Sequence, residues 1–248
     1  MIYFVWRWTP VAQYMHSLIE SGYLGGLYDC HFERWGGHFL GNGYAWRSDP
    51  ERALGVLGDL GSHLIDMARW YLGDVTSVSA HMGRFVDRKD AAGQPTSARS
   101  IDSAALLVEF ENGTQTTIKT SGVAHEADRG TADHVVLHGA LGKLESEFTF
   151  RGSDPAEGIT RMEASLWGAR KDDASFRELE IPNGFSGEAD ASSPFDMLTK
   201  YPVGDRLFID AILEGKQVRP NFEDGLRVQQ IMQAAIESHE TGKSVSLD

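Results

Sequence analysis

The sequence has few of the features that mark exported or membrane proteins. Its 248 residues include one cysteine, Cys30, which excludes an internal disulfide framework and a metal cluster built from cysteines alone. The opening apolar run, Ile2 to Trp6, is shorter than a signal-peptide core, and no run approaches the roughly 18 apolar residues of a membrane-spanning helix. These absences predict a soluble, cytoplasmic protein that does not bind membranes.

Positive charge is also scarce. The chain has 23 Lys and Arg against 36 Asp and Glu, which gives a net charge of −13. Because proteins bind nucleic acid through Lys and Arg that release counterions from the phosphates, this balance argues against a nucleic-acid partner. Small molecules and further copies of the chain are the expected partners.

Several catalytic and nucleotide-binding motifs are missing. Gly41-Asn-Gly43 continues into Tyr44-Ala45-Trp46, so the third glycine of a dinucleotide-binding turn is absent. The sequence also contains no P-loop, no Gly-x-Ser-x-Gly nucleophile elbow and no His-Glu-x-x-His pair. The residues therefore provide no recognisable phosphate cradle or serine nucleophile.

The hydrophobic pattern predicts a sheet bounded by helices. Apolar residues at helical spacing predict helices over residues 10–22, 56–72, 202–214 and 222–241. Strands are expected over residues 2–7, 75–84, 103–110, 114–121, 134–138, 143–150, 161–167 and 176–181. Polar and apolar residues alternate in several of these strands, which is typical of antiparallel sheets with one face in water. We therefore expect an α+β fold, with an open, mostly antiparallel sheet and helices packed on one face.

The stretch from Gly58 to Trp70 carries the clearest chemical pattern. Asp59 and His63 are four residues apart, so on a helix they lie about 40° apart on one face. A carboxylate one turn before a histidine can orient the imidazole for acid–base catalysis. The alternative is structural. In this interpretation Asp59 caps the helix, His63 lies on the surface, and Gly58 and Gly61 make room for a neighbouring strand.

Two further interpretations involve nearby residues. Asp59, His63 and Asp66, with His38 or His31, could bind a divalent ion, although no ligand pair with a recognised spacing supports this. The glycine-rich loop over residues 36–43, which contains His38, precedes Trp46 and Arg47. Such a loop could line a polyol or carboxylate pocket, or it could simply be anchored by a buried tryptophan.

The motifs taken in order resemble one known family. Leu57-Gly-Asp-Leu-Gly-Ser-His-Leu-Ile-Asp66, preceded by Trp46-Arg47, resembles the C-terminal domain of the Gfo/Idh/MocA oxidoreductases. Further matching pieces are residues 3–10 with 18–25, residues 102–113, and residues 208–215, 220–225 and 234–238. The resemblance covers nearly the whole chain.

The resemblance implies an NAD- or NADP-dependent oxidoreductase that acts on a hydroxyl or carbonyl of a sugar, inositol or related polyol. It implies that His63 handles the proton of the reacting oxygen and that Asp59 orients it or the substrate. Arg47, Trp46 and His38 would contact the substrate, Arg7 would approach the cofactor, and no metal would be involved. Homodimers or higher homo-oligomers through the open sheet are expected, because members of the family commonly dimerise there.

The family's Glu-Lys-Pro motif and its glycine-rich turn are absent from this sequence. We therefore expect residues 1–24 to be the last strand and crossover helix of a missing dinucleotide-binding domain, and residues 25–248 to be the substrate-binding and oligomerisation domain. The isolated chain should then transfer no hydride. A non-catalytic carbohydrate-binding or dimerisation module is the alternative, and a metal-dependent isomerase or lyase is a weaker one.

Overall fold

The computed structural model describes residues 1–96, 100–127, 130–151, 161–185 and 203–247. Within these residues, nine strands form one sheet in the order β8-β7-β6-β5-β1-β4-β3-β2-β9. The strands are β1 (Leu27–Trp35), β2 (Val75–Gly83), β3 (Ser103–Phe110), β4 (Gln115–Ser121), β5 (Thr131–Gly139), β6 (Gly142–Arg151), β7 (Arg161–Arg170), β8 (Arg177–Glu178) and β9 (Val245–Ser246). Every pair of neighbours is antiparallel except β1 and β4. The expected α+β fold with an open, mostly antiparallel sheet is confirmed.

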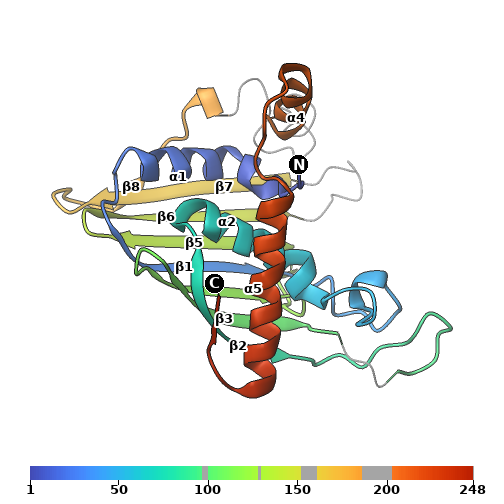
Figure 1. Ribbon diagram of the computed structural model, residues 1–248. Helices are drawn as coiled ribbons and strands as arrows, with labels where there is room; N and C mark the ends of the chain where they lie inside the picture. Colours follow the sequence, from blue (N-terminus) through green and yellow to red (C-terminus); the bar gives the residue numbers. More distant parts are fainter. Residues whose placement is uncertain (97–99, 128–129, 152–160, 186–202, 248) are drawn as a thin grey trace.

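The helices α1 (Pro10–Glu20), α2 (Ser62–Leu72) and α5 (Phe222–Thr241) cover one face of the sheet (Figure 1). Their ends carry the expected signals: Thr9 caps α1, and Asn221 forms a capping box at the start of α5. None of the helices in the described part of the chain is long and apolar enough to cross a membrane.

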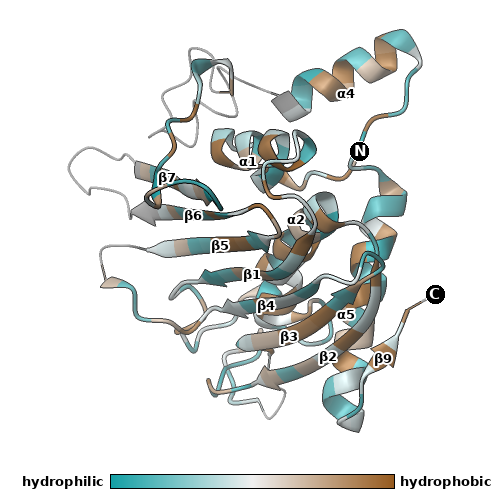
Figure 2. Ribbon diagram, turned by 90° about the vertical axis from the view of Figure 1, so that its left-hand side faces the viewer, coloured by the Kyte–Doolittle hydropathy of each residue, from teal (hydrophilic) through white to brown (hydrophobic). Residues whose placement is uncertain are grey.

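The two faces of the sheet differ in what covers them (Figure 2). Along β3, residues Ala104, Leu106, Val108 and Phe110 are buried beneath the helices. Leu107, which points to the opposite face, is 54 % exposed. The strand therefore has the period-2 alternation of a sheet packed on one side only.

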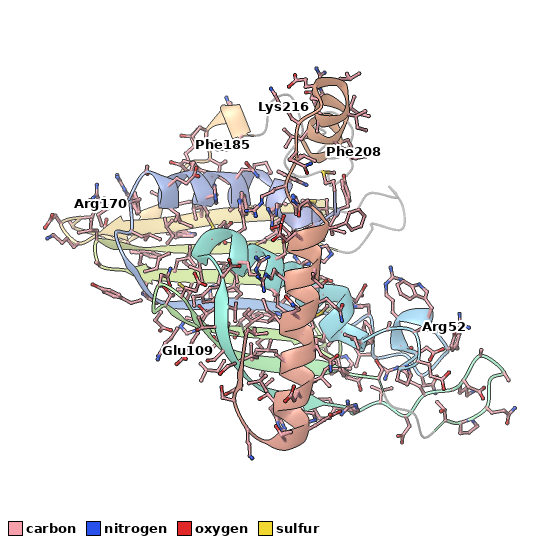
Figure 3. The ribbon with its side chains drawn as sticks, in the orientation of Figure 1. Arg52, Glu109, Arg170, Phe185, Phe208 and Lys216 are labelled. Atoms are coloured by element: carbon pink, nitrogen blue, oxygen red, sulfur yellow. The ribbon has the colours of Figure 1, made fainter. Side chains whose placement is uncertain are left out.

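Helix α4 (Val203–Glu214) lies apart from the sheet, above the other helices in Figure 1. Its apolar side chains are largely in solvent, including Phe208, which is labelled in Figure 3 and is 41 % exposed. The helix was expected to begin at residue 202, which lies outside the described residues.

The strand expected at residues 2–7 is absent. Residues 1–4 are irregular and Val5–Trp8 form a short 3₁₀ helix, η1. A strand needs a neighbour for its backbone hydrogen bonds, and no described strand pairs with this segment. Phe4 and Trp6 instead contact His63 on α2, and Trp6 also contacts Phe148 on β6. The proposed domain boundary after residue 24 stays a prediction.

The sequence reasoning also missed β1, the strand at the centre of the sheet. Its buried positions are Cys30, Phe32 and Arg34, whereas the positions between them are partly exposed. An arginine on the buried face obscures the apolar alternation that identifies strands. This strand proves to be important for the candidate site.

Candidate active site

The candidate site lies where the loop after β1 meets the start of the helical stretch over residues 57–72, which ends in α2. Gly55 enters this stretch with a φ of +59°, and a Cβ there would lie 2.3 Å from the carbonyl oxygen of Ile101. Glycine is the residue that tolerates both conditions. Leu57–Gly61 then form η3, a π-helical turn that precedes α2. Single π turns are rare in helices and are frequent at functional sites.

Gly61 lets this stretch approach the sheet closely. A Cβ at Gly61 would lie 3.4 Å from Cγ2 of Thr120 on β4 and 3.1 Å from Cδ1 of Leu57. A Cβ at Gly58 would meet only the Leu54 side chain, at 3.2 Å. Gly61 therefore lies within van der Waals distance of β4, whereas Gly58 does not, so the structural interpretation is consistent with Gly61 alone.

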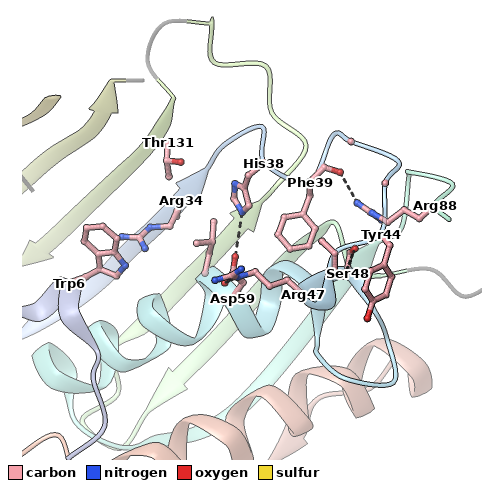
Figure 4. A pocket seen from close by; sticks show the side chains of 14 residues that line it. Trp6, Arg34, His38, Phe39, Tyr44, Arg47, Ser48, Asp59, Arg88 and Thr131 are labelled. Atoms are coloured by element: carbon pink, nitrogen blue, oxygen red, sulfur yellow. Dashed lines mark hydrogen bonds and ion pairs between the residues drawn. The ribbon is translucent and has the colours of Figure 1, made fainter. Parts of the chain in front are cut away.

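Asp59 projects from the π turn and is held by the side chains of Arg47 and His38. Nε of Arg47 donates a hydrogen bond of 2.8 Å to its carboxylate, and Nε2 of His38 lies 3.6 Å from the other oxygen (Figure 4). Desolvation is the largest influence on this carboxyl and opposes ionisation, yet hydrogen bonds from His38 and Arg47 keep its pKa below the usual value. Asp59 is therefore an anion at neutral pH with an ordered orientation.

His63 lies one turn further along, largely buried beneath the N-terminal segment. Its ring makes edge contacts with Phe4 and Trp6, at centroid distances of 5.7 and 6.2 Å. Desolvation, and to a lesser extent the charge of Arg34, lower the pKa of His63 to about 3, although Asp59 opposes the shift. Among the described residues its buried Nδ1 has no hydrogen-bond partner. The imidazole is therefore neutral at pH 7.

Two cavities adjoin these residues. The larger, of about 720 Å³, is lined by Trp6, Arg34, His38, Arg47 and Asp59 among others (Figure 4). A second, of about 500 Å³, is lined by His63 and Trp46 and also by Arg47 and Asp59. The Arg47–Asp59 pair thus forms a common wall. The larger cavity has the volume of a typical small-molecule site.

Of the two remaining predicted site residues, Trp46 lines the smaller cavity and Arg7 does not reach either cavity. Trp46 is 54 % exposed and stacks on Arg47, whose Cζ lies 4.6 Å from the ring centroid. Arg7 lines neither cavity: its Nε donates a 2.9 Å hydrogen bond to buried Asp66, and its guanidinium packs on Trp70. A role for Arg7 at a cofactor stays a prediction.

Of the candidate metal ligands, only Asp59 and His38 lie close to each other. Asp66 is bound by Arg7, and His31 contacts Thr117 and Asp29 on the sheet. In the parts of the chain that the structure describes, no group of three His, Cys, Asp or Glu side chains could hold a metal ion.

Sequence reasoning missed several residues that line the larger cavity: Trp6, Arg34, Tyr44, Arg88 and Thr131. Arg34 had a detectable signal, because it follows Cys30 and Phe32 at period 2 and so belongs to the buried face of β1. A charged residue at an inward position is unusual and suggests a specific role. Arg88 and Thr131 come from distant parts of the chain and join the cavity only through the fold.

Comparison with known proteins agrees with this architecture. Residues 16–247 match the family described as "Oxidoreductase family, C-terminal alpha/beta domain". Levoglucosan dehydrogenase of Pseudarthrobacter phenanthrenivorans is 24 % identical over 96 % of this chain and 64 % of that protein. D-apiose dehydrogenase of Rhizobium rhizogenes is also 24 % identical, over 100 % of this chain and 64 % of that protein.

A solved structure of levoglucosan dehydrogenase in complex with NADH and levoglucosan superposes with a TM-score of 0.82 at 23 % identity, covering 100 % of this chain and 66 % of that one. At this identity, the likeness shows a common fold. The chain spans a little under two thirds of the length of the curated relatives named above. The match over residues 16–247 establishes that the chain belongs to the Gfo/Idh/MocA oxidoreductase family and corresponds to its C-terminal domain.

Proposed function

We propose that this chain provides the substrate-binding part of an NAD- or NADP-dependent oxidoreductase that acts on a hydroxyl or carbonyl of a sugar, inositol or related polyol. The observation that carries this proposal is the position of Asp59, held by Arg47 and His38, in the wall shared by two cavities of about 720 and 500 Å³, the smaller of which His63 also lines. The relatives that are named as dehydrogenases of levoglucosan and D-apiose support a sugar as substrate.

Each residue has a chemical role in this proposal. Asp59 is ionised and oriented, so it can accept a hydrogen bond from a substrate hydroxyl. His63 is neutral, so it can accept the hydroxyl proton during oxidation and return it during reduction. Arg47 and His38 hold Asp59 and can donate to other substrate oxygens, and exposed Trp46 can pack on the apolar face of a sugar ring.

The described residues do not fit a nicotinamide dinucleotide. The sequence contains no Gly-x-Gly-x-x-Gly turn with which to hold a pyrophosphate at a helix N-terminus. The chemistry assigned to this chain is therefore limited to substrate binding and proton transfer. A pKa of about 3 also makes His63 a weak base at neutral pH. Both observations support the expectation that the isolated chain transfers no hydride.

The same observations favour a second candidate, a carbohydrate-binding or dimerisation module without catalysis. A weakly basic histidine and a preformed cavity are sufficient for binding alone. The two candidates differ in the effect of His63→Ala. Loss of turnover in a complete, active assembly supports the enzyme, whereas a change confined to ligand affinity supports the module.

The first experiment is a calorimetric titration of the 248-residue chain with levoglucosan, myo-inositol and D-glucose, together with NADH and NADPH. We expect saturable binding of at least one polyol and no binding of either nucleotide. Failure of a wider panel of sugars and polyols to bind would contradict the substrate assignment. Turnover of a polyol with NAD or NADP by the chain alone would contradict the expectation that it transfers no hydride.

A further inference from the structure

We propose that Arg34 is a ligand-binding residue of the larger cavity, and that its Nη1 donates a hydrogen bond to an oxygen of a neutral polyhydroxylated ligand. This inference rests on the proposed function, because it takes the cavity beside Asp59 as the substrate site. It adds a residue from the central strand that none of the site motifs contains.

The geometry of Arg34 is fixed by its neighbours. The residue is 1 % exposed, and its Nε and Nη2 both donate to the carboxylate of Asp133 on β5. The flat face of the guanidinium lies on Trp6, with Cζ 4.4 Å from the ring centroid. Figure 4 shows the side chain between Trp6 and His38 at the cavity. An arginine held on one edge and one face has little rotational freedom left.

The third nitrogen of this guanidinium, Nη1, is not bound by Asp133. Among the described residues, Nη1 of Arg34 is buried and has no hydrogen-bond partner, although Arg34 lines the larger cavity. A buried donor without a partner is costly, and burial of a charged donor is more so. A ligand oxygen in the cavity would satisfy this donor without moving the arginine.

The charges around the cavity indicate a neutral ligand. Each of the three arginines that line it has its own carboxylate: Arg34 pairs with Asp133, Arg47 with Asp59, and Arg88 with Asp102. Little net positive charge therefore remains to compensate an anionic ligand for the loss of its hydration. The available interaction is a hydrogen bond from a cationic donor, which a hydroxyl or ring oxygen can accept.

The test compares Arg34→Lys with the wild-type chain by calorimetric titration of levoglucosan, myo-inositol and D-glucose. Lysine keeps the charge next to Asp133, but it cannot donate to Asp133 with two nitrogens and to a ligand with a third. We expect the affinity for the polyol that binds the wild type to fall about 10- to 100-fold, the usual range for one charged hydrogen bond. An unchanged affinity would overturn the proposal.

A matched control is Arg69→Lys. Arg69 is also a mostly buried arginine in ion pairs, with Asp74 and Asp224, but it does not line either of the cavities beside Asp59. The double variant Arg34→Gln/Asp133→Asn provides a second route if Arg34→Lys fails to fold, because it replaces the buried ion pair with a neutral amide pair. It should fold and bind the polyol at least 10-fold more weakly than the wild type.

The ligand class is tested separately with D-glucuronate, which carries a carboxylate in place of the terminal hydroxymethyl group of D-glucose. We expect glucuronate to bind the wild-type chain no more tightly than the neutral sugar. Tighter binding of glucuronate that Arg34→Lys abolishes would overturn the assignment of a neutral ligand. If no polyol binds the wild type, the proposed function fails. If a polyol binds and both Arg34 variants retain its affinity, only the role of Arg34 fails.

Discussion

Asp59 and Asp66 lie seven residues apart on one continuous helical stretch, and each is paired with an arginine. Their environments are nevertheless opposite. Asp66 is 1 % exposed, and burial raises its pKa to about 6 in spite of the Arg7 guanidinium. Asp59 is partly exposed at the cavity wall, and the hydrogen bonds from His38 and Arg47 outweigh its desolvation and lower its pKa.

The comparison shows how one helix serves both the core and the site. From Leu64 to Ala68 every residue is buried beneath neighbouring elements, whereas Gly58 to Leu60 and Ser62 to His63 are only partly covered. A carboxylate enclosed with its arginine stabilises the packing and is closed to ligands. A carboxylate at the partly covered end keeps its charge and remains accessible.

The largest expected effect is the loss of the enclosed carboxylate. Asp66→Ala leaves Arg7 buried without a counter-charge, so the free energy of unfolding should fall by about 3–5 kcal/mol. Urea unfolding followed by circular dichroism measures this change. Asp59→Ala is the matched variant and should cost less than about 1 kcal/mol, because Arg47 is half exposed and can be hydrated. Equal losses would remove the distinction between the two carboxylates.

The next largest expected effect is the pH dependence of stability that is due to His63, which lies between Asp59 and Asp66. The pKa of His63 is lowered to about 3 in the folded chain, from 6.5 when unfolded, so the unfolded state binds more protons between these values. The contribution of His63 to stability is therefore complete above pH 6.5 and is lost as the pH falls below it. Between pH 7 and pH 5 the loss should be about 2 kcal/mol.

His63→Phe removes this contribution and keeps an aromatic ring against Phe4 and Trp6. The stability of the wild type relative to this variant should therefore fall by about 2 kcal/mol between pH 7 and pH 5. The raised pKa of Asp66 acts in the opposite direction, because its contribution is lost as the pH rises through about 6. It is common to both proteins and cancels in the difference. His81→Gln, at an exposed histidine, should not reproduce the change.

A smaller change in stability should accompany a clear loss of binding at Asp59. Asp59→Asn keeps the shape of the side chain but removes the charge that Arg47 and His38 hold in place. We expect polyol affinity to fall about 10-fold, with less than about 1 kcal/mol lost in unfolding. Calorimetric titration and urea unfolding on one preparation distinguish these effects. Unchanged affinity would place Asp59 outside the binding site.

The smallest change in the free energy of unfolding is expected for a substitution on the sheet. One face of the sheet is covered by helices and the other is accessible to solvent. We propose that the uncovered face pairs with a second copy of the chain. It exposes Tyr28, Leu107 and Trp167, which are 62, 54 and 39 % accessible. Leu107→Glu should change stability by less than about 0.5 kcal/mol and shift a dimer toward monomer in sedimentation experiments. A wild-type chain that sediments as a monomer at high concentration would contradict this proposal.

The sequence predicted the parts of the fold that have a local signal. The long helix over residues 222–241 has a cap, an acidic first turn and a terminal glycine, and the hairpin of β3 and β4 has Asn112-Gly113 between two alternating segments. The prediction of a strand over residues 2–7 was wrong, because a strand needs a hydrogen-bonding partner as well as an apolar, β-branched composition. The central strand β1 was missed because Arg34 interrupts its apolar face.

The candidate site, like the fold, could be predicted from the sequence only where its residues are close together in the chain. Asp59 and His63 share a helical stretch, so their spacing could suggest that they act together. Arg34 is 99 positions from Asp133, and no local pattern connects them. The cavity is assembled from η1, β1 and the loop that follows it, the π turn η3, the segment after β2 and the start of β5. Only the three-dimensional arrangement reveals which side chains it brings together.

The placement of β1 has a consequence for how this protein reaches its native state. This strand is made early in the chain but pairs with β4 in parallel and with β5, partners that lie about a hundred positions later. It cannot join a growing meander of consecutive hairpins. Such long-range pairing is a slow step in folding. Refolding should therefore restore far-ultraviolet circular dichroism before it restores ligand binding, which makes the cavity a reporter of the last strand pairings to form.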